Sequence, residues 1–310
     1  MVNGDSFRMT NRSGHDIFPY ICGESILNLM FLIFDAGSTK TDVRLVKEDG
    51  SYLSAELAGI NPFFMDADAI RDELSRSSGM CDPSAVDSVF YYGAGCVADY
   101  EPLFVDILSS LFPKARVEAH SDLFAACRAT LGDGAGIACI MGTGSNSCYY
   151  DGSVVVSNVP PLGYVLGDEG SGATMGRQLV GDVLKGCAPA DVCERFWRWY
   201  GSDRKAIMDG VYRGSFPNRF LATFSRFLAE NADLPYCRAV VERSFVSFFE
   251  RNVLQYPTDV REMGFVGSIA SHFSDILREV AGRYGYVVRT IEGRPMDALA
   301  AYHKGKSFPA

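Results

Sequence analysis

The chain has 310 residues, of which 47% are hydrophobic and 22% charged, so it is long enough for two domains with a substantial core. The net charge is −9 and no basic stripe is visible, which argues against a nucleic-acid partner. The longest apolar stretches are only strand-length, so we expect no membrane-spanning segment.

The first confident strand follows Met30 and opens an α/β pattern. Three successive strands, MFLIFDA, TDVRLVK and SYLSAELA, are separated by the turns GSTK and EDG. A helix over 66–77, the strand VDSVFYYG, a helix over 100–111 and the strand ARVEAHS come next. Residues 1–29 have weak periodicity and lack the features of a signal peptide, so we expect a poorly ordered or spurious extension, with Met30 as the hypothetical start.

A second round of the same pattern starts at Gly136. GIACIMG, NSCYYDG and SVVVSNV read as strands, and long helical segments are predicted over 172–254. The strand EMGFVGS, a helix over 269–282, the strand GYVVRTIEG and a last helix from Pro295 complete the chain. Because both rounds open with strand, glycine-rich turn, strand and strand, the sequence predicts an internal structural repeat.

Nine scattered cysteines lack any C-x-x-C pair, and several lie in apolar runs. We interpret them as buried free thiols of a protein in a reducing compartment, which favours a cytoplasmic location.

The stretch FDAGSTKTD is the first of two glycine-rich turns that directly follow an apolar strand. Small residues and free backbone N–H groups can wrap a phosphate, because glycine lets the main chain approach it closely. Asp35 at the strand end is a candidate to hold Mg²⁺, which favours carboxylate and phosphate oxygens. A plain hairpin turn with incidental polar residues is the alternative.

The second turn, MGTGSNS, carries Gly142, Thr143, Gly144 and Ser145 after a buried strand. It leads into another strand and so is not a dinucleotide-binding fingerprint. Two such turns at matching positions of a repeat nevertheless favour phosphate contact.

The stretch GDEGSG places Asp168 and Glu169 just before a helical segment. Either residue could accept hydrogen bonds from a polyol; stabilisation of the helix N-terminus by the acids is the alternative.

In GFVGSIASHF, Gly267 and Ser268 form a tight turn between a strand and a helix. They could lie against adenine and ribose, where bulk is excluded; a close structural turn is equally consistent with the pattern.

Asp122 lies where the strand ARVEAHS gives way to a helix. An aspartate there is commonly an N-cap. A carboxylate between two phosphate-binding turns is also where a general base for a sugar hydroxyl is needed.

Together these stretches resemble the actin-like ATPase and sugar-kinase superfamily, and within it the N-acetylglucosamine kinase branch of the BadF/BadG/BcrA/BcrD ATPases. FDAGSTKTD resembles the first phosphate motif, MGTGSNS the second, MGFVGSIA the adenosine motif, and GDEGSG is the most specific match. The resemblance covers the chain from Met30 onward. It implies two actin-like (ribonuclease H-like) domains, each a mixed five-stranded sheet with helices, around an interdomain cleft: 30–132 with about 292–310, and 133–291.

The resemblance implies ATP-dependent phosphorylation of an amino sugar, most simply N-acetylglucosamine at its 6-hydroxyl, with ATP and Mg²⁺ as cofactors. Asp122 would be the general base and Asp35 would organise Mg²⁺. The residues implied to contact ATP or its phosphates are Gly37, Ser38, Thr39, Lys40, Thr41, Gly142, Thr143, Gly267 and Ser268. Those implied to contact the sugar are Asn61, Asp122, Gly144, Ser145, Asp168 and Glu169.

Two positions depart from the family pattern. Leu162 and Gly163 stand where animal members have a tryptophan–glycine pair, which leaves the sugar open, with glucosamine and N-acetylmuramic acid as further acceptors. Asp297 stands where many relatives have glycine. Rival functions are an activating ATPase for a dehydratase, which needs an iron–sulfur cluster, and a non-catalytic sugar or nucleotide sensor. The resemblance also allows a homodimer.

Overall fold

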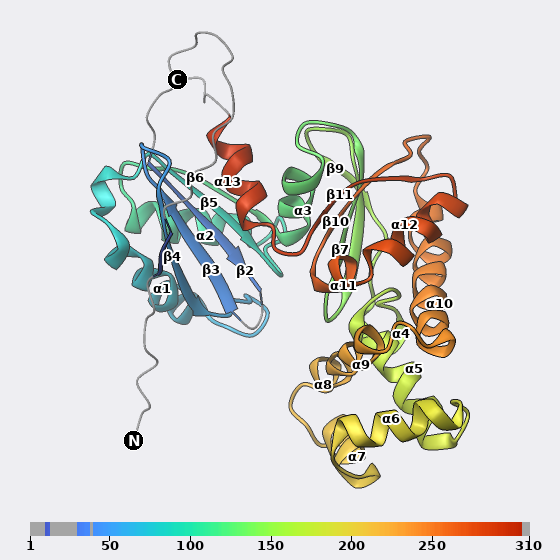
Figure 1. Cartoon of the computed structure of the whole chain (residues 1–310). Helices are drawn as coiled ribbons and strands as arrows, with labels where there is room; N and C mark the ends of the chain where they lie inside the picture. The colour runs from blue at the N-terminus through green and yellow to red at the C-terminus, as the bar shows by residue number, and fades with distance from the viewer. Residues whose placement is uncertain (1–9, 13–29, 38–39, 306–310) are drawn as a thin grey trace, which may run out of the picture. The chain divides into compact units, whose positions relative to one another are not determined.

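The computed structural model describes residues 10–12, 30–37 and 40–305. The expectation for residues 1–29 therefore lies almost wholly outside the described residues, as do the assignments of Ser38 and Thr39. Within these ranges the chain divides into two compact units (Figure 1). The first comprises residues up to 125 together with those from 296, and the second comprises residues 126–295.

The first unit is built on a mixed sheet in the order β1-β4-β3-β2-β5-β6. Strands β2, β3 and β4 form the antiparallel meander that the sequence predicts, and β5 and β6 join β2 in parallel. The strands are β1 Thr10–Arg12, β2 Phe31–Ala36, β3 Lys40–Val46, β4 Tyr52–Ala58, β5 Ser88–Gly93 and β6 Arg116–Ser121. The helices are α1 Ala67–Ser75, η1 Arg76–Met80, η2 Pro83–Ala85, α2 Glu101–Leu111 and α13 Met296–Lys304, while α3 Asp122–Thr130 crosses into the second unit.

The second unit repeats this topology, with the strand order β9-β8-β7-β10-β11. β7, β8 and β9 correspond to β2, β3 and β4, which confirms the predicted repeat. The strands are β7 Gly136–Met141, β8 Ser145–Tyr150, β9 Val155–Asn158, β10 Glu262–Val266 and β11 Val287–Glu292. The helices are α4 Gly163–Leu166, α5 Gly172–Lys185, α6 Ala190–Tyr200, α7 Arg204–Tyr212, α8 Pro217–Thr223, α9 Ser225–Glu230, α10 Pro235–Arg251, η3 Val253–Gln255, α11 Ser268–His272 and α12 Ser274–Arg283.

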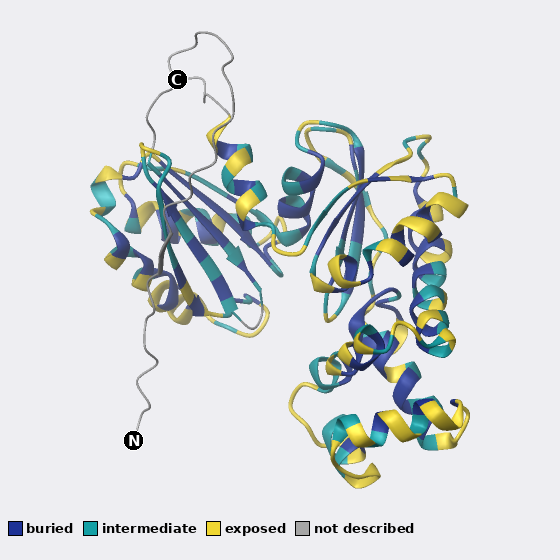
Figure 2. Cartoon of the chain, viewed as in Figure 1, coloured by how far each residue is buried: buried dark blue, intermediate teal, exposed yellow. Residues whose placement is uncertain are grey.

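The central strands are buried on both faces because helices cover both sides of each sheet (Figure 2). In the first unit, Tyr91 of β5 packs against Phe104 of α2, whereas Phe90 stacks on His303 of α13. Side chains alternate along a strand, so the neighbouring residues 90 and 91 reach opposite layers. No helix among the described residues is long and apolar enough to cross a membrane.

Helix α13 belongs to the first unit. Asp297 forms an ion pair with Arg44 of β3, and the Arg44 guanidinium lies 4.2 Å from the centre of the Tyr52 ring. This gives Asp297, for which the sequence suggested no role, a structural one: it attaches the start of α13 to the meander.

Candidate functional site

The first glycine-rich turn connects the buried strand β2 to β3. The Gly37 N–H donates to the Lys40 carbonyl at 2.9 Å, and the Ile60 N–H donates to the Gly37 carbonyl at 3.2 Å. The second bond holds Ile60 at this turn, and Asn61 is the residue that follows Ile60. The Asn61 side-chain oxygen accepts a hydrogen bond from the Phe63 N–H at 3.0 Å, which orients the amide.

Two polar side chains of this turn region have partners within the sheet. The Lys40 Nζ contacts Asp42 at 2.8 Å and Glu56 at 3.2 Å. The buried Thr41 hydroxyl donates to the Ala58 carbonyl at 3.0 Å. Lys40 must therefore exchange partners to reach a phosphate.

Asp35 lies at the carboxyl end of β2, where ligands of open α/β sheets commonly bind. It pairs with Asp42 on β3 in the sheet register. Burial, followed by the negative charges of Asp42 and Asp122, raises the pKa of Asp35 to about 7, although Lys40 opposes the shift. The negative charges that raise this pKa also create a potential that favours a cation at the strand end.

Asp122 is the first residue of α3, directly after β6. The Phe124 N–H donates to the Ser121 hydroxyl at 3.3 Å, so Ser121 is the capping residue of α3. Burial raises the pKa of Asp122, and hydrogen bonds with the backbone of Leu123 and of Asp122 itself oppose that rise. The carboxylate therefore lies against the backbone N–H groups at the start of α3.

The second glycine-rich turn joins β7 to β8 in the second unit. It is closed by a 2.9 Å bond from the Gly142 N–H to the Gly144 carbonyl. The carbonyls of Gly142 and Thr143 accept from the N–H groups of Gly172 and Ala173, at 2.9 and 3.1 Å. These carbonyls thus satisfy donors at the start of α5 that otherwise lack intrahelical partners.

Asp168 lies against the second turn. A side-chain carbon on Gly144 would be 3.0 Å from an Asp168 carboxylate oxygen, and the Ser145 N–H donates to that carboxylate at 3.5 Å. The backbone of Asp168 is left-handed, with φ of 54°, and its N–H donates to the Pro161 carbonyl at 2.9 Å. Burial is the main cause that raises the pKa of Asp168 to about 6.

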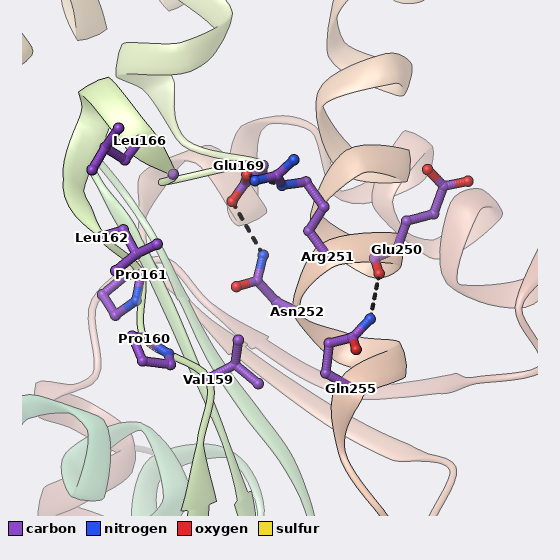
Figure 3. A pocket seen from close by; sticks show the side chains of 11 residues that line it. Val159, Pro160, Pro161, Leu162, Leu166, Glu169, Glu250, Arg251, Asn252 and Gln255 are labelled. Atoms are coloured by element: carbon purple, nitrogen blue, oxygen red, sulfur yellow. Dashed lines mark hydrogen bonds and ion pairs between the residues drawn. The ribbon is translucent and has the colours of Figure 1, made fainter.

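Glu169 lines a cavity of about 360 Å³ (Figure 3). Its carboxylate forms a 2.5 Å ion pair with Arg251 and a 3.3 Å hydrogen bond with Asn252. One wall of the cavity is apolar and the other polar; its lining residues are Val159, Pro160, Pro161, Leu162, Leu166, Gly167, Glu169, Glu250, Arg251, Asn252 and Gln255. Glu169 therefore fastens the loop to the end of α10.

Gly267 connects β10 to α11 in a conformation that excludes other residues. Its φ is +118°, and a side-chain carbon there would lie 2.2 Å from the Met141 carbonyl oxygen. The Gly267 N–H also donates to the Glu292 carbonyl at 2.8 Å. This packing places Ser268 beside the end of β7, from which the second turn emerges.

We expect Gly267→Ala to lower the free energy of unfolding by about 3 kcal/mol, because backbone strain and a clash with main-chain atoms act together. Urea denaturation would measure the change. Gly282→Ala is the matched control: this glycine lies in α12 with open space around it and should be neutral or up to about 1 kcal/mol more stable as alanine. Equal stability of the Gly267→Ala variant and the parent chain would contradict the packing argument.

The predicted residues fall into two groups, one in each unit. The first unit holds Asp35, Gly37, Lys40, Thr41, Asn61 and Asp122. The second holds Gly142, Thr143, Gly144, Ser145, Asp168, Glu169, Gly267 and Ser268. Sequence reasoning missed Arg251 and Asn252, which lie more than 80 positions from Glu169 and follow no recognisable motif.

Comparison with solved structures gives a strong similarity. The chain is 43% identical to a candidate N-acetylglucosamine kinase from Porphyromonas gingivalis, with a TM-score of 0.81 over 89% of this chain and 99% of that one. A second candidate N-acetylglucosamine kinase, from Chromobacterium violaceum, is 19% identical with a TM-score of 0.62 over 89% and 99% of the two chains, a likeness of fold alone. No family model and no curated protein matches the chain.

Proposed function

Because this chain belongs to the N-acetylglucosamine kinase branch of the BadF/BadG/BcrA/BcrD ATPases, within the actin-like ATPase and sugar-kinase superfamily, we propose that it phosphorylates N-acetylglucosamine at the 6-hydroxyl. Family membership makes it an ATP-dependent sugar kinase. The observation that carries the finer proposal is Asp122, a carboxylate at the carboxyl end of the first sheet whose pKa burial raises, beside Ser121, the residue that caps α3.

Asp122 is the general base in this proposal. It accepts the proton of the acceptor hydroxyl as that oxygen attacks the γ-phosphorus of ATP, and ADP leaves. A raised pKa suits the role, since a base works best when its pKa approaches the working pH. The remaining acceleration comes from positioning and from neutralising charge on the phosphates.

Asp35 is the residue we propose for Mg²⁺, directly or through water. The negative charges that Asp42 and Asp122 place near Asp35 fit a divalent cation, because a bound cation would offset the repulsion that raises the pKa of Asp35. In the described part of the chain, no three His, Cys, Asp or Glu residues form a metal cluster of their own. Mg²⁺ typically takes only one or two carboxylates and completes its shell with phosphate oxygens and water. When bound, it neutralises phosphate charge.

The two glycine-rich turns are the proposed phosphate contacts. Gly37 through Thr41 supply the first and Gly142 with Thr143 the second. In the second turn the carbonyls are held by the start of α5, which supports a role for backbone N–H groups and the Thr143 hydroxyl in meeting an anion. Gly267 and Ser268 would border the adenosine, because a side chain at position 267 has no room.

The sugar contacts we propose come from both units. Asn61 is fixed beside the first turn, and Gly144, Ser145 and Asp168 lie together at the second. Asp168 is an acceptor for sugar hydroxyls. Glu169 contributes indirectly, since its carboxylate is bound to Arg251 and Asn252 and so holds the loop that carries Asp168.

A coupled assay of ADP release with a panel of amino sugars tests the proposal. We expect N-acetylglucosamine to give the highest kcat/KM, followed by glucosamine and N-acetylmuramic acid, with the product identified as a 6-phosphate by mass spectrometry and NMR. Turnover of none of the panel would refute it. The eight cysteines found free among the described residues suit our further proposal that the reaction takes place in the cytoplasm.

Replacing Asp168 by asparagine should weaken sugar binding, because an amide offers one acceptor oxygen and loses the charge. We expect the KM for N-acetylglucosamine to rise about 10- to 100-fold with the KM for ATP unchanged. Steady-state kinetics with each substrate varied in turn would measure both constants. Unchanged sugar KM would remove Asp168 from the acceptor site.

The Asp168→Asn substitution should also change how the free energy of unfolding of the ligand-free protein depends on pH. The folded pKa of Asp168 is about 6, above its ordinary value of 3.8, so between these values the unfolded chain has lost a proton that the folded chain keeps. Asp168 should therefore contribute a fall in stability of roughly 2 to 3 kcal/mol as the pH rises from about 4 to 6, in addition to the falls from Asp35 and Asp122, and Asp168→Asn should remove that contribution. Asp151, whose pKa hydrogen bonds in its turn lower, is the control: its asparagine variant should keep the fall.

A further inference from the structure

Tyr91 has a hydroxyl that neither the fold nor the proposed mechanism uses so far. The residue is fully buried, and its hydroxyl has no hydrogen-bond partner among the described residues. Buried polar side-chain groups are nearly always paired, so an exception calls for an explanation. The ring is held in place by stacking on Phe104, with centroids 4.2 Å apart and planes at 18°.

The position of this hydroxyl is fixed by its neighbour Gly93. A side-chain carbon on Gly93 would lie 2.5 Å from the Tyr91 oxygen, so the hydroxyl fills the space that a side chain at 93 would take. In the sheet register, Gly93 pairs with Ala36 on one side and Ser121 on the other. The hydroxyl therefore lies at the last rung of the sheet, between the strand end that carries Asp35 and the one that precedes Asp122.

The groups that surround the hydroxyl are acids or weak acids. After burial, the Cys96 thiol, Asp122 and Asp35 are the groups that raise the pKa of Tyr91. Tyr91 accordingly stays protonated and is a hydrogen-bond donor that faces potential acceptors. Of these acceptors, Asp122 is the one whose carboxylate must be oriented toward the sugar hydroxyl in the proposed reaction.

We propose that Tyr91 is a positioning residue for phosphoryl transfer, whose hydroxyl donates a hydrogen bond to the Asp122 carboxylate when acceptor and nucleotide are bound. The inference rests on the proposed function of Asp122 as base. Catalytic hydrogen bonds often tighten only in the loaded enzyme, which reconciles the role with the unpartnered hydroxyl seen here. In this arrangement Tyr91 holds one carboxylate oxygen of Asp122, and the other oxygen accepts the proton of the sugar hydroxyl. A third group orients the base in the same way in catalytic triads.

The substitution Tyr91→Phe removes this hydroxyl and little else. We expect kcat with N-acetylglucosamine and MgATP to fall about 10-fold or more, the typical effect of losing a hydrogen bond to a charged group. Both KM values should stay within twofold of the parent values. The melting temperature should not fall, because no hydrogen bond of the ligand-free protein is lost.

A matched control is Tyr150→Phe in the second unit. Tyr150 is equally buried, but its hydroxyl donates to the Gly152 carbonyl at 2.9 Å, so its loss should lower the melting temperature and leave kcat unchanged. The decisive comparison adds Tyr91→Phe to Asp122→Asn. If Tyr91 acts through Asp122, the second substitution should cause no further loss of the residual activity.

Three results would overturn the inference: parental kcat in Tyr91→Phe, a rise in KM alone, or an equal additional loss in the Asp122→Asn background. A different result would show that the proposed function itself is wrong. In that case the parent chain itself shows no sugar-dependent release of ADP, and the inference falls with it.

Discussion

Asp122→Asn is expected to lower kcat for N-acetylglucosamine phosphorylation by about 10²- to 10⁴-fold, the usual contribution of a positioned general base. Asparagine keeps the shape of the side chain but cannot accept the proton. ATP binding should be unchanged, because Asp122 contacts the acceptor in this mechanism. Single-turnover kinetics would measure the chemical step, and calorimetry with ATP would measure binding.

Asp106→Asn provides the charge control for this experiment. Asp106 is exposed on α2 in the same unit and lies outside the proposed site, so its substitution should leave kcat unchanged. Near-parental turnover of Asp122→Asn would exclude Asp122 as the base. Loss of ATP binding along with turnover would instead point to a structural defect.

Asp35→Asn is expected to have the second large effect, through the metal. We expect the Mg²⁺ concentration for half-maximal activity to rise about 10- to 100-fold. At saturating Mg²⁺, kcat should still be lower by about 10²-fold, because a fixed charge that aligns the phosphates is gone. Activity titrations with Mg²⁺ at constant ATP would separate the two effects.

The comparison variant here is Asp49→Asn, an exposed acid in the turn after β3 that accepts a hydrogen bond from the Ser51 N–H. Its Mg²⁺ titration should overlay that of the parent. If the Asp35→Asn curve also overlays the parent curve, the metal is organised by other residues, and the crowding of acids around Asp35 needs another explanation.

Much of the fold was predictable because its signals are local. The apolar run before Asp35, the alternation in β3 and the glycine turns are read directly from neighbouring residues, and the same order of strands follows Gly136. The repeat confirmed by the sheet topology also placed both glycine-rich turns at equivalent positions. The sequence did not predict the short helix α4. This helix follows Leu162, whose φ of 62° is left-handed, and a leucine gives no indication of that conformation.

The site was less predictable where it depends on contacts between distant segments. Sequence could name Glu169 as a polar candidate but not that Arg251 and Asn252 bind its carboxylate. Likewise, the sequence does not show that the Thr41 hydroxyl donates to the Ala58 carbonyl. From the sequence, Tyr91 is indistinguishable from an ordinary core residue. The direction of its ring depends on packing partners such as Phe104, which the sequence does not reveal.

The return of α13 to the first unit also bears on how the protein is made. His303 stacks on Phe90 with centroids 3.6 Å apart, and its ring nitrogen is 2.8 Å from the Tyr92 hydroxyl. This face of the first sheet is therefore covered only after residue 303 has been translated. By that time every residue of the second unit has been synthesised. The half of the molecule encoded first is thus the half completed last, because a chain that ends before α13 lacks the contacts that His303 makes with Phe90 and Tyr92.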